Sequence, residues 1–114
     1  MHIESYEFGS IVIQGQSYTR DVQIVPGRVI PQWWRKNGHH VVLEDIPELL
    51  RADPERIVFG TGKPGLMRVS SDLRDFLQQQ CIGIVEQPTA VAVETVNTAL
   101  QAGRRFAAGL HLSC

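Results

Sequence analysis

A glycine-rich turn follows the most apolar segment of the chain. Residues 60–65 read Gly-Thr-Gly-Lys-Pro-Gly directly after residues 57–59, which matches the GxGxxG pattern of dinucleotide-binding turns. In that fold the third glycine packs inside the first turn of a helix whose N-terminus faces the pyrophosphate. Here Pro64 precedes Gly65 and the next helix-capping residue is Ser70, so the helix begins too late. The pattern predicts a tight turn at a strand end, and we expect no cofactor.

The same turn could still hold a small anion. Ligands of open α/β sheets bind beyond the carboxyl ends of parallel strands. Free backbone amides at Gly60, Thr61 and Gly62 would attract a phosphate or carboxylate. Lys63 and a helix N-terminus at Thr89 would add positive charge. These five residues are the candidate ligand-binding or anion-binding residues, although glycines at a strand end more often serve the turn alone.

The histidines and cysteines do not form a metal-binding or catalytic pattern. His111 and Cys114 lie three residues apart, which places them on opposite faces of a strand, and the adjacent His39 and His40 diverge in the same way. Neither spacing suits a zinc site. Cys81 is expected at a helix C-terminus, where the dipole disfavours a thiolate. We therefore expect no metal site and no catalytic residue, and interpret His111 as a partly buried histidine with a hydrogen-bond partner.

The tandem tryptophans form the most informative aromatic cluster. Trp33 and Trp34 are followed directly by Arg35. Two adjacent indoles in a loop-like segment cannot easily both enter a small core, which leaves one of them available at the surface. Tryptophan and arginine dominate the energetics of protein interfaces. The three residues are candidates for contact with a partner protein, and the alternative is that both rings pack at the ends of the sheet.

Composition and charge exclude several classes of protein. The 114 residues are 43% hydrophobic and 20% charged, as expected for one globular domain over residues 1–114. The net charge is −1 and the arginines are scattered, so nucleic acid is not an expected partner. No apolar run reaches the ~20 residues of a membrane span, and the N-terminus lacks a secretory signal. We expect a cytoplasmic protein with free thiols and leave a homodimer open.

The secondary structure that positions these residues is expected to be of the α/β class. Alternating apolar residues predict an N-terminal β-hairpin with residues 11–13 and 18–24 on either side of a turn at 14–17. A short helix is predicted from its N-cap Asp45 to Arg51, with an early proline. The first half of the chain therefore supplies a hairpin and one helix.

From Arg56 onward the elements alternate. The spacing of apolar residues predicts strands at 56–60, 84–86 and 106–112. Between them it predicts one helix from Ser70 to a cap at Gly83 and another from Thr89 to Gly103. Such alternation favours right-handed crossovers and a parallel core. The expected fold is therefore α/β, with a mixed β-sheet, an N-terminal β-hairpin and three helices.

The order of several short motifs resembles the uncharacterised Mth-type α/β domain family, which includes the adipogenesis-associated Mth-type domain protein and the mitochondrial complex I assembly factor 3. The resemblance runs over nearly the whole chain, and its marks are Tyr18–Ile24, Trp34-Arg35 with Gly38-His39, Ile57–Gly62, Thr89-Ala90 with Asn97, Gly103–Arg105 and Leu110–Cys114.

The resemblance implies a three-layer α/β fold in which the hairpin packs against the mixed sheet, with no established enzymatic activity. It also implies that mitochondrial relatives bind protein partners during assembly of respiratory complex I. We therefore expect a non-catalytic protein-interaction module that resembles an assembly factor. The alternative is a small-molecule or anion-binding protein, or an enzyme, that uses the crevice at Gly60-Thr61-Gly62.

Overall fold

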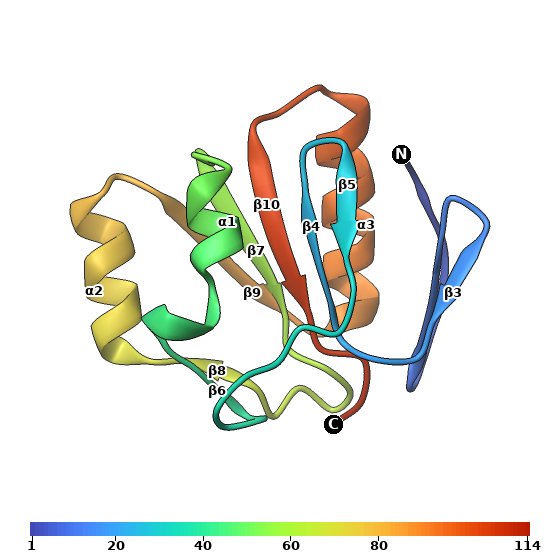
Figure 1. Ribbon diagram of the computed structural model, residues 1–114, viewed down its shortest axis with the longest axis horizontal. Helices are drawn as coiled ribbons and strands as arrows, with labels where there is room; N and C mark the ends of the chain where they lie inside the picture. The colour runs from blue at the N-terminus through green and yellow to red at the C-terminus, as the bar shows by residue number, and fades with distance from the viewer.

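The computed structural model describes residues 1–114 and contains ten strands and three α-helices (Figure 1). A single turn of 3-10 helix, Leu43–Asp45, precedes the first α-helix. The helices are α1 (Pro47–Arg51), α2 (Ser71–Gln79) and α3 (Thr89–Gln101), and the strands are β1 (Ile3–Glu7), β2 (Ser10–Ile13), β3 (Gln16–Tyr18), β4 (Val22–Val25), β5 (Arg28–Ile30), β6 (His40–Val41), β7 (Arg56–Gly60), β8 (Arg68–Val69), β9 (Gly83–Gln87) and β10 (Phe106–Leu110).

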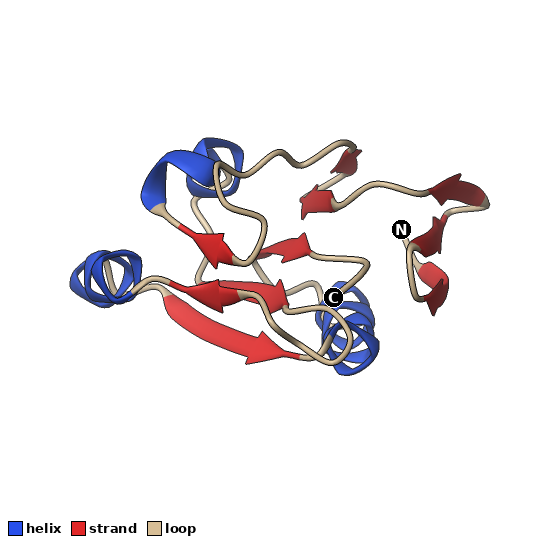
Figure 2. Ribbon diagram, turned by 90° about the horizontal axis from the view of Figure 1, so that it is seen from below, coloured by secondary structure: helices blue, strands red, loops and turns tan.

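A mixed five-stranded sheet forms the middle of three layers. Its strands lie in the order β5-β4-β10-β7-β9. Figure 2 shows α1 and α2 on one side of this sheet, and α3 with a small three-stranded sheet on the other. A separate hydrophobic cluster fills the space on each side. The expected three-layer α/β architecture with a mixed sheet and three helices is confirmed.

The parallel core matches the predicted alternation of strands and helices. β7 pairs in parallel with both β9 and β10, and α2 and α3 are the connections between these strands. β4 runs antiparallel to β10, which makes the sheet mixed. β7 is one continuous apolar run because both of its faces are covered, and four of its five residues are buried. All three strands end at the same edge of the sheet, where the candidate site lies.

The N-terminal hairpin differs from the prediction in its second strand. β2 and β3 form the hairpin, and β1 pairs with the other edge of β2 to complete a separate three-stranded sheet. Val22 and Ile24, which we expected in the hairpin, lie in β4 of the central sheet. The physical reason is burial, since all four residues of β4 are buried while β3 keeps a solvated face. β4 therefore needs cover on both faces, which a hairpin strand lacks.

Several predicted element ends are corrected by the structure. Asp45 is not the N-cap of α1, because Ile46 takes that position and the Asp45 carboxylate accepts a hydrogen bond from the Val42 amide over 2.9 Å. Gly83 does not cap α2 but opens β9, and Cys81 adopts the positive φ of 60° beyond the helix. The last strand stops at Leu110, two residues earlier than predicted. None of the three helices combines the length and apolar character of a membrane span.

Candidate functional site

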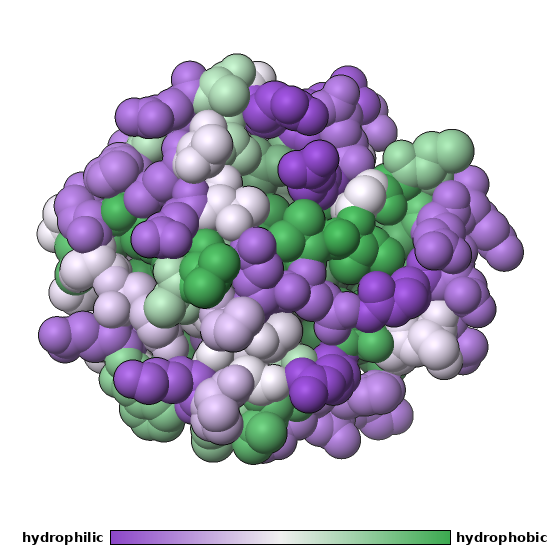
Figure 3. Space-filling view, turned by 180° about the vertical axis from the view of Figure 1, so that it is seen from behind, coloured by the Kyte–Doolittle hydropathy of each residue, from purple (hydrophilic) through white to green (hydrophobic).

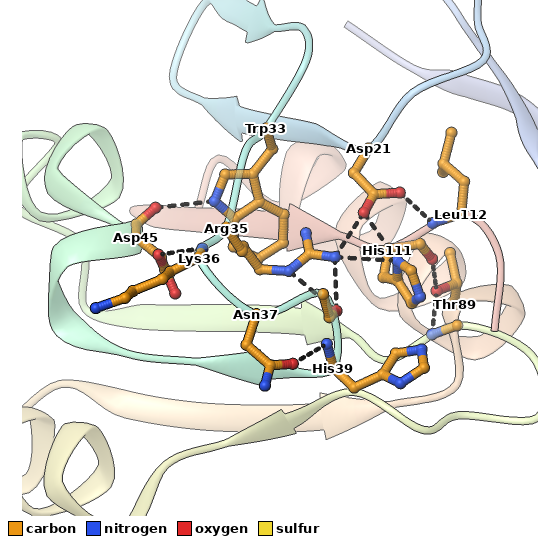
Figure 4. Close-up of polar contacts among 12 residues, drawn as sticks. Asp21, Trp33, Arg35, Lys36, Asn37, His39, Asp45, Thr89, His111 and Leu112 are labelled. Carbon is orange, nitrogen blue, oxygen red and sulfur yellow. Dashed lines mark hydrogen bonds and ion pairs between the residues drawn. The ribbon is translucent and has the colours of Figure 1, made fainter.

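The register of β4 against β10 brings Asp21 beside His111 at the carboxyl edge of the sheet. Val22 pairs with Leu110 in the antiparallel ladder, so the residue before β4 meets the residue after β10. His111 Nδ1 donates a hydrogen bond to Asp21 Oδ2 over 2.8 Å (Figure 4). The carboxylate thereby fixes the tautomer of the neutral ring and leaves Nε2 as an acceptor. The expectation that His111 is buried beside a hydrogen-bond partner is confirmed.

Arg35 is the second partner of Asp21. Its Nη2 donates to Asp21 Oδ2 over 2.7 Å and to the Gly38 carbonyl over 2.9 Å, and its side chain is only 3% exposed. The guanidinium also lies 3.2 Å from His111 Nδ1. Both of those nitrogens donate to the same carboxylate oxygen, so this approach is a contact between two donors rather than a hydrogen bond. The three side chains form one buried ionic cluster.

The ionic cluster holds the Asp21 carboxylate in its charged form. Burial alone would raise the pKa of Asp21, but hydrogen bonds from His111, the Leu112 amide and Arg35, together with the arginine charge, lower that pKa below its ordinary value of 3.8. The Leu112 amide donates to Oδ1 over 2.8 Å. Asp21 therefore ties β4 and the segment after β10 to the Arg35 loop.

Two nitrogens of the ionic cluster remain unpaired. His111 Nε2 and Arg35 Nη1 are buried and form no hydrogen bond with another residue. A buried polar group without a partner costs about 1–3 kcal/mol, so stability alone does not explain the arrangement. The exposed ring of His39 packs edge-on against His111 with the ring centroids 5.8 Å apart. An imidazole oriented by a carboxylate can accept a proton at Nε2, and here the chain places no hydroxyl or thiol within hydrogen-bond distance of that atom.

The structure separates the three predicted partner-contact residues. Trp33 is buried, its Nε1 donates to the Asp45 carbonyl over 2.8 Å, and the Arg35 guanidinium lies 4.4 Å above its ring. Trp33 packs so closely on β10 that a Cβ at Gly109 would lie 2.7 Å from the ring. Trp34, between these two anchored residues, is 76% exposed. One ring therefore packs and the other is exposed, and Trp34 is the side chain of the three that can reach a partner; contact with a partner stays a prediction.

The backbone amides of the Gly60–Lys63 turn are not free, contrary to our expectation. The Thr61 amide donates to the Gln87 carbonyl, and the Lys63 amide donates to the Ser113 carbonyl, each over 2.8 Å. The Gly62 amide donates over 2.8 Å to the hydroxyl of Thr89, which in turn donates to the His111 carbonyl. The Thr89 hydroxyl therefore links three segments by hydrogen bonds, namely α3, the Gly62 turn and the segment after β10, and it does not cap the helix. The expected ligand or anion binding at Gly60, Thr61, Gly62, Lys63 and Thr89 stays a prediction, and an anion there would have to compete with these bonds.

Two hollows flank the Gly60–Lys63 turn. One has a volume of 570 Å³ and is lined by Phe8, Gly62 and Lys63, among others. The other has a volume of 390 Å³ and is lined by Thr61 and Arg68, among others. Both open at the carboxyl ends of parallel strands, where open α/β sheets bind ligands. No three His, Cys, Asp or Glu side chains lie together in a way that could hold a metal ion.

The ionic cluster is the part of the site that the sequence did not reveal. Asp21 and His111 are 90 residues apart and Arg35 lies between them, so no local spacing links them. A signal did exist for Asp21 and His111, because each of them stands next to the end of an apolar strand. Pairing β4 with β10 would have brought them together, but the prediction assigned β4 to the hairpin.

The chain matches the family described as Protein of unknown function (DUF498/DUF598) over residues 3–111. An outer membrane protein from Bartonella henselae has the same fold, with 27% identity and a TM-score of 0.83 over 98% of this chain and 94% of that one. The protein MT938 is 30% identical, with a TM-score of 0.77 over 99% and 98% of the two chains. A Mth938-like domain protein from Bordetella pertussis is 18% identical, with a TM-score of 0.71 over 97% and 85%, and shows the fold alone. No curated protein matches. The resemblance to an uncharacterised Mth-type domain family is thus confirmed.

Proposed function

The chain belongs to the DUF498/DUF598 family of proteins of unknown function, and from this premise we propose that it is a non-catalytic protein-interaction module. The exposure of Trp34 between two buried, anchored neighbours carries the proposal. Binding costs free energy when a mobile loop must be ordered, and a loop already held on both sides avoids much of that cost. An exposed indole on a fixed base has the properties of an interface hot spot.

Two further exposed apolar side chains support a binding surface at this end of the molecule. Phe8 is 58% and Leu66 is 48% exposed. The Phe8 turn is fixed by a hydrogen bond from the Gly9 amide to the Leu112 carbonyl, and the Leu66 amide donates to the Cys114 carbonyl. The Trp34 loop is fixed by the bond from the Trp33 amide to the Asp21 carbonyl. Three loops with exposed apolar tips are therefore held by the segment after β10 and by the ionic cluster.

We propose that the partner belongs to the assembly of respiratory complex I, and that the protein acts in the cytoplasm. The support for the partner is the resemblance to the mitochondrial complex I assembly factor 3, which implies that mitochondrial relatives act through protein partners. One fold hosts many functions, so the identity of the partner depends on experiment.

Replacing Trp34 by alanine is expected to weaken partner binding at least about thirtyfold, because a hot-spot side chain contributes about 2 kcal/mol or more. The measurement is affinity capture with the purified protein, followed by quantitative mass spectrometry for complex I subunits and assembly proteins. The control is Val91→Ala, since Val91 is 44% exposed on α3 and lies outside the three loops. The free energy of unfolding of both variants should lie within about 0.5 kcal/mol of the wild-type value. If Trp34→Ala and wild type retrieve the same proteins in the same amounts, Trp34 is not the contact.

The second candidate function is binding of a small anion at the Gly60–Lys63 turn. The 570 Å³ hollow beside Lys63 is the observation that favours it, since the side chain of Lys63 forms no ion pair within the chain. A lysine at the rim of a hollow can hold a phosphate or carboxylate by charge. In this arrangement the Lys63 ammonium binds the anion, because the turn amides are occupied by other bonds.

A thermal-shift panel of phosphate, nucleotides and small carboxylates tests the anion site. A ligand present at a hundred times its dissociation constant adds about 2.7 kcal/mol of stability and so raises the midpoint of unfolding. The shift should disappear in Lys63→Ala and persist in Lys36→Ala, whose lysine lies on the Trp34 loop. A panel in which no compound raises the midpoint contradicts this candidate.

A further inference from the structure

β9 leaves one edge of the central sheet without a neighbour. It stands last in the strand order, and β7 is its single partner. Figure 2 shows no helix or strand against its outer side. An uncovered edge strand presents backbone donors and acceptors on which another strand can pair. β9 therefore offers a docking edge that the proposed contact at Trp34 does not involve.

The hydrogen bonds to β7 identify which groups of β9 face outward. The Gly83 amide donates to the Glu55 carbonyl, and the Gln87 carbonyl accepts from the Thr61 amide. In a parallel strand the groups of alternate residues point to the same side, so those of Val85 also face β7. The N–H and C=O groups of Ile84 and Glu86 then point away from the sheet.

The surface beside this edge is apolar in its middle and charged around it. Ile84 and Val85 are half-buried, and on the Val85 face α3 leaves a groove of 350 Å³ whose lining includes Phe106 and Val58, the pairing partner of Val85. Figure 3 views the molecule from this side and shows apolar patches near the middle of the face, with hydrophilic side chains between and around them. An apolar centre within a polar rim is the usual anatomy of a protein interface.

We propose that a second copy of this chain pairs with the free edge of β9, antiparallel and centred on Val85. In that register the outward N–H and C=O groups of Ile84 in each copy bond with those of Glu86 in the other copy. The two chains therefore exchange four hydrogen bonds. Val85 meets its own copy on the two-fold axis. Glu86 faces an isoleucine rather than another carboxylate, so the register opposes no like charges.

The charges at the two ends of β9 complement each other in this register. Arg56 flanks the first residue of β9, because a Cβ at Gly83 would lie 3.5 Å from its side chain. Glu94 precedes Thr95, whose hydroxyl bonds over 2.7 Å to the side chain of Gln87, the last residue of β9, and Glu94 lines the same groove as Arg56. Antiparallel pairing places the two ends opposite each other, so Arg56 of each copy faces Glu94 of the other. Neither residue has an ion-pair partner within its own chain.

Sedimentation velocity and light scattering over a concentration series test the dimer. The wild-type mass should rise toward twice the 12.8 kDa of one chain. Glu94→Arg and Arg56→Glu should each raise the dissociation constant at least about tenfold, because two attractive pairs become repulsive. The double variant exchanges the two charges. Its dissociation constant should return to within about threefold of the wild-type value, since both attractive pairs are restored.

The control variant is Glu44→Arg, which makes the same charge change on an exposed residue in the other layer and should leave the dimer unchanged.

Hydrogen exchange supplies a direct reading of the register. Concentrated protein should protect the amides of Ile84 and Glu86, while the Val85 amide, already bonded to β7, should not change. A mass equal to one chain at every concentration overturns the proposal. This holds even if a strand of another protein is found to pair with the edge of β9. A dimer that both single variants leave intact overturns it as well.

Discussion

Asp21→Asn is expected to lower the free energy of unfolding by about 3–5 kcal/mol, because it leaves the Arg35 charge buried without a counter-ion. The amide has nearly the shape of the carboxylate, so the loss reflects charge and hydrogen bonding rather than a cavity. For a domain of this size the melting temperature should fall by about 10–20 °C. Urea unfolding monitored by circular dichroism and calorimetry measures both quantities.

Glu48→Gln is the matched control for Asp21→Asn. Glu48 forms ion pairs with Arg28 and Arg51, but both arginines are well exposed. Ion pairs at the surface contribute about 0–1 kcal/mol, so this control should change stability little. Adding Arg35→Met to Asp21→Asn should recover part of the lost stability, since it removes the unpaired charge. Equal effects of Asp21→Asn and Glu48→Gln would show that the ionic cluster does not contribute to stability.

The same cluster predicts how wild-type stability depends on pH. The pKa of Asp21 is lowered in the folded protein, and its ordinary value is 3.8. A group with a depressed folded pKa stabilises the fold above its unfolded pKa and loses that contribution as the pH falls through the folded pKa. The contribution of Asp21 should therefore be complete above about pH 4 and decline below it. Asp21→Asn should remove this part of the acid dependence, so the two stability curves should converge at low pH.

The second half of the fold was predictable from local patterns, whereas the site was not. The spacing of Leu73, Phe76 and Leu77 identified α2, and its start followed from Ser70, whose hydroxyl accepts from the Leu73 amide. Such signals lie within a few residues of one another. The pairing of Asp21 with His111 depends on which strand β4 joins, and a four-residue strand does not contain that information.

The tryptophan pair shows the same limit at the level of single side chains. The sequence left open whether one indole stays exposed or both pack, and the structure buries Trp33 and exposes Trp34. The sequence did not indicate that Arg35 is buried, because the carboxylate that pairs with it lies 14 residues upstream in the chain. A buried arginine is tolerated where such a partner exists, and finding that partner requires the strand register.

The GxGxxG match contains a glycine that is required for a structural reason unrelated to dinucleotide binding. The turn at 60–62 carries no helix to face a pyrophosphate, since α2 begins at Ser71. Instead the chain end packs against it, and a Cβ at Gly62 would lie 2.2 Å from the Ser113 carbonyl oxygen and 2.7 Å from the His111 ring. Gly62 is therefore required for the close approach of two backbones.

Gly62→Ala is accordingly expected to destabilise the fold by about 3–5 kcal/mol. Its φ of +96° strains any residue with a Cβ by about 1–3 kcal/mol, and the clash with the chain end adds about 1–3 kcal/mol. Gly15→Ala is the control, because Gly15 has a φ of +77° but nothing within 4 Å of a Cβ, so it should lose about 1–2 kcal/mol.

Urea unfolding of the two glycine variants separates backbone strain from close approach. The difference between them should be about 1–3 kcal/mol if the packed chain end matters, since both variants carry the strain of a positive φ and only one carries the clash. The displaced segment should also release the hydrogen bond from the Lys63 amide to Ser113, which native-state hydrogen exchange reports. Equal losses of stability in the two variants, with the Lys63 amide still protected, would mean that the chain end moves aside without cost. The segment after β10 would then not hold the Gly60–Lys63 turn in place.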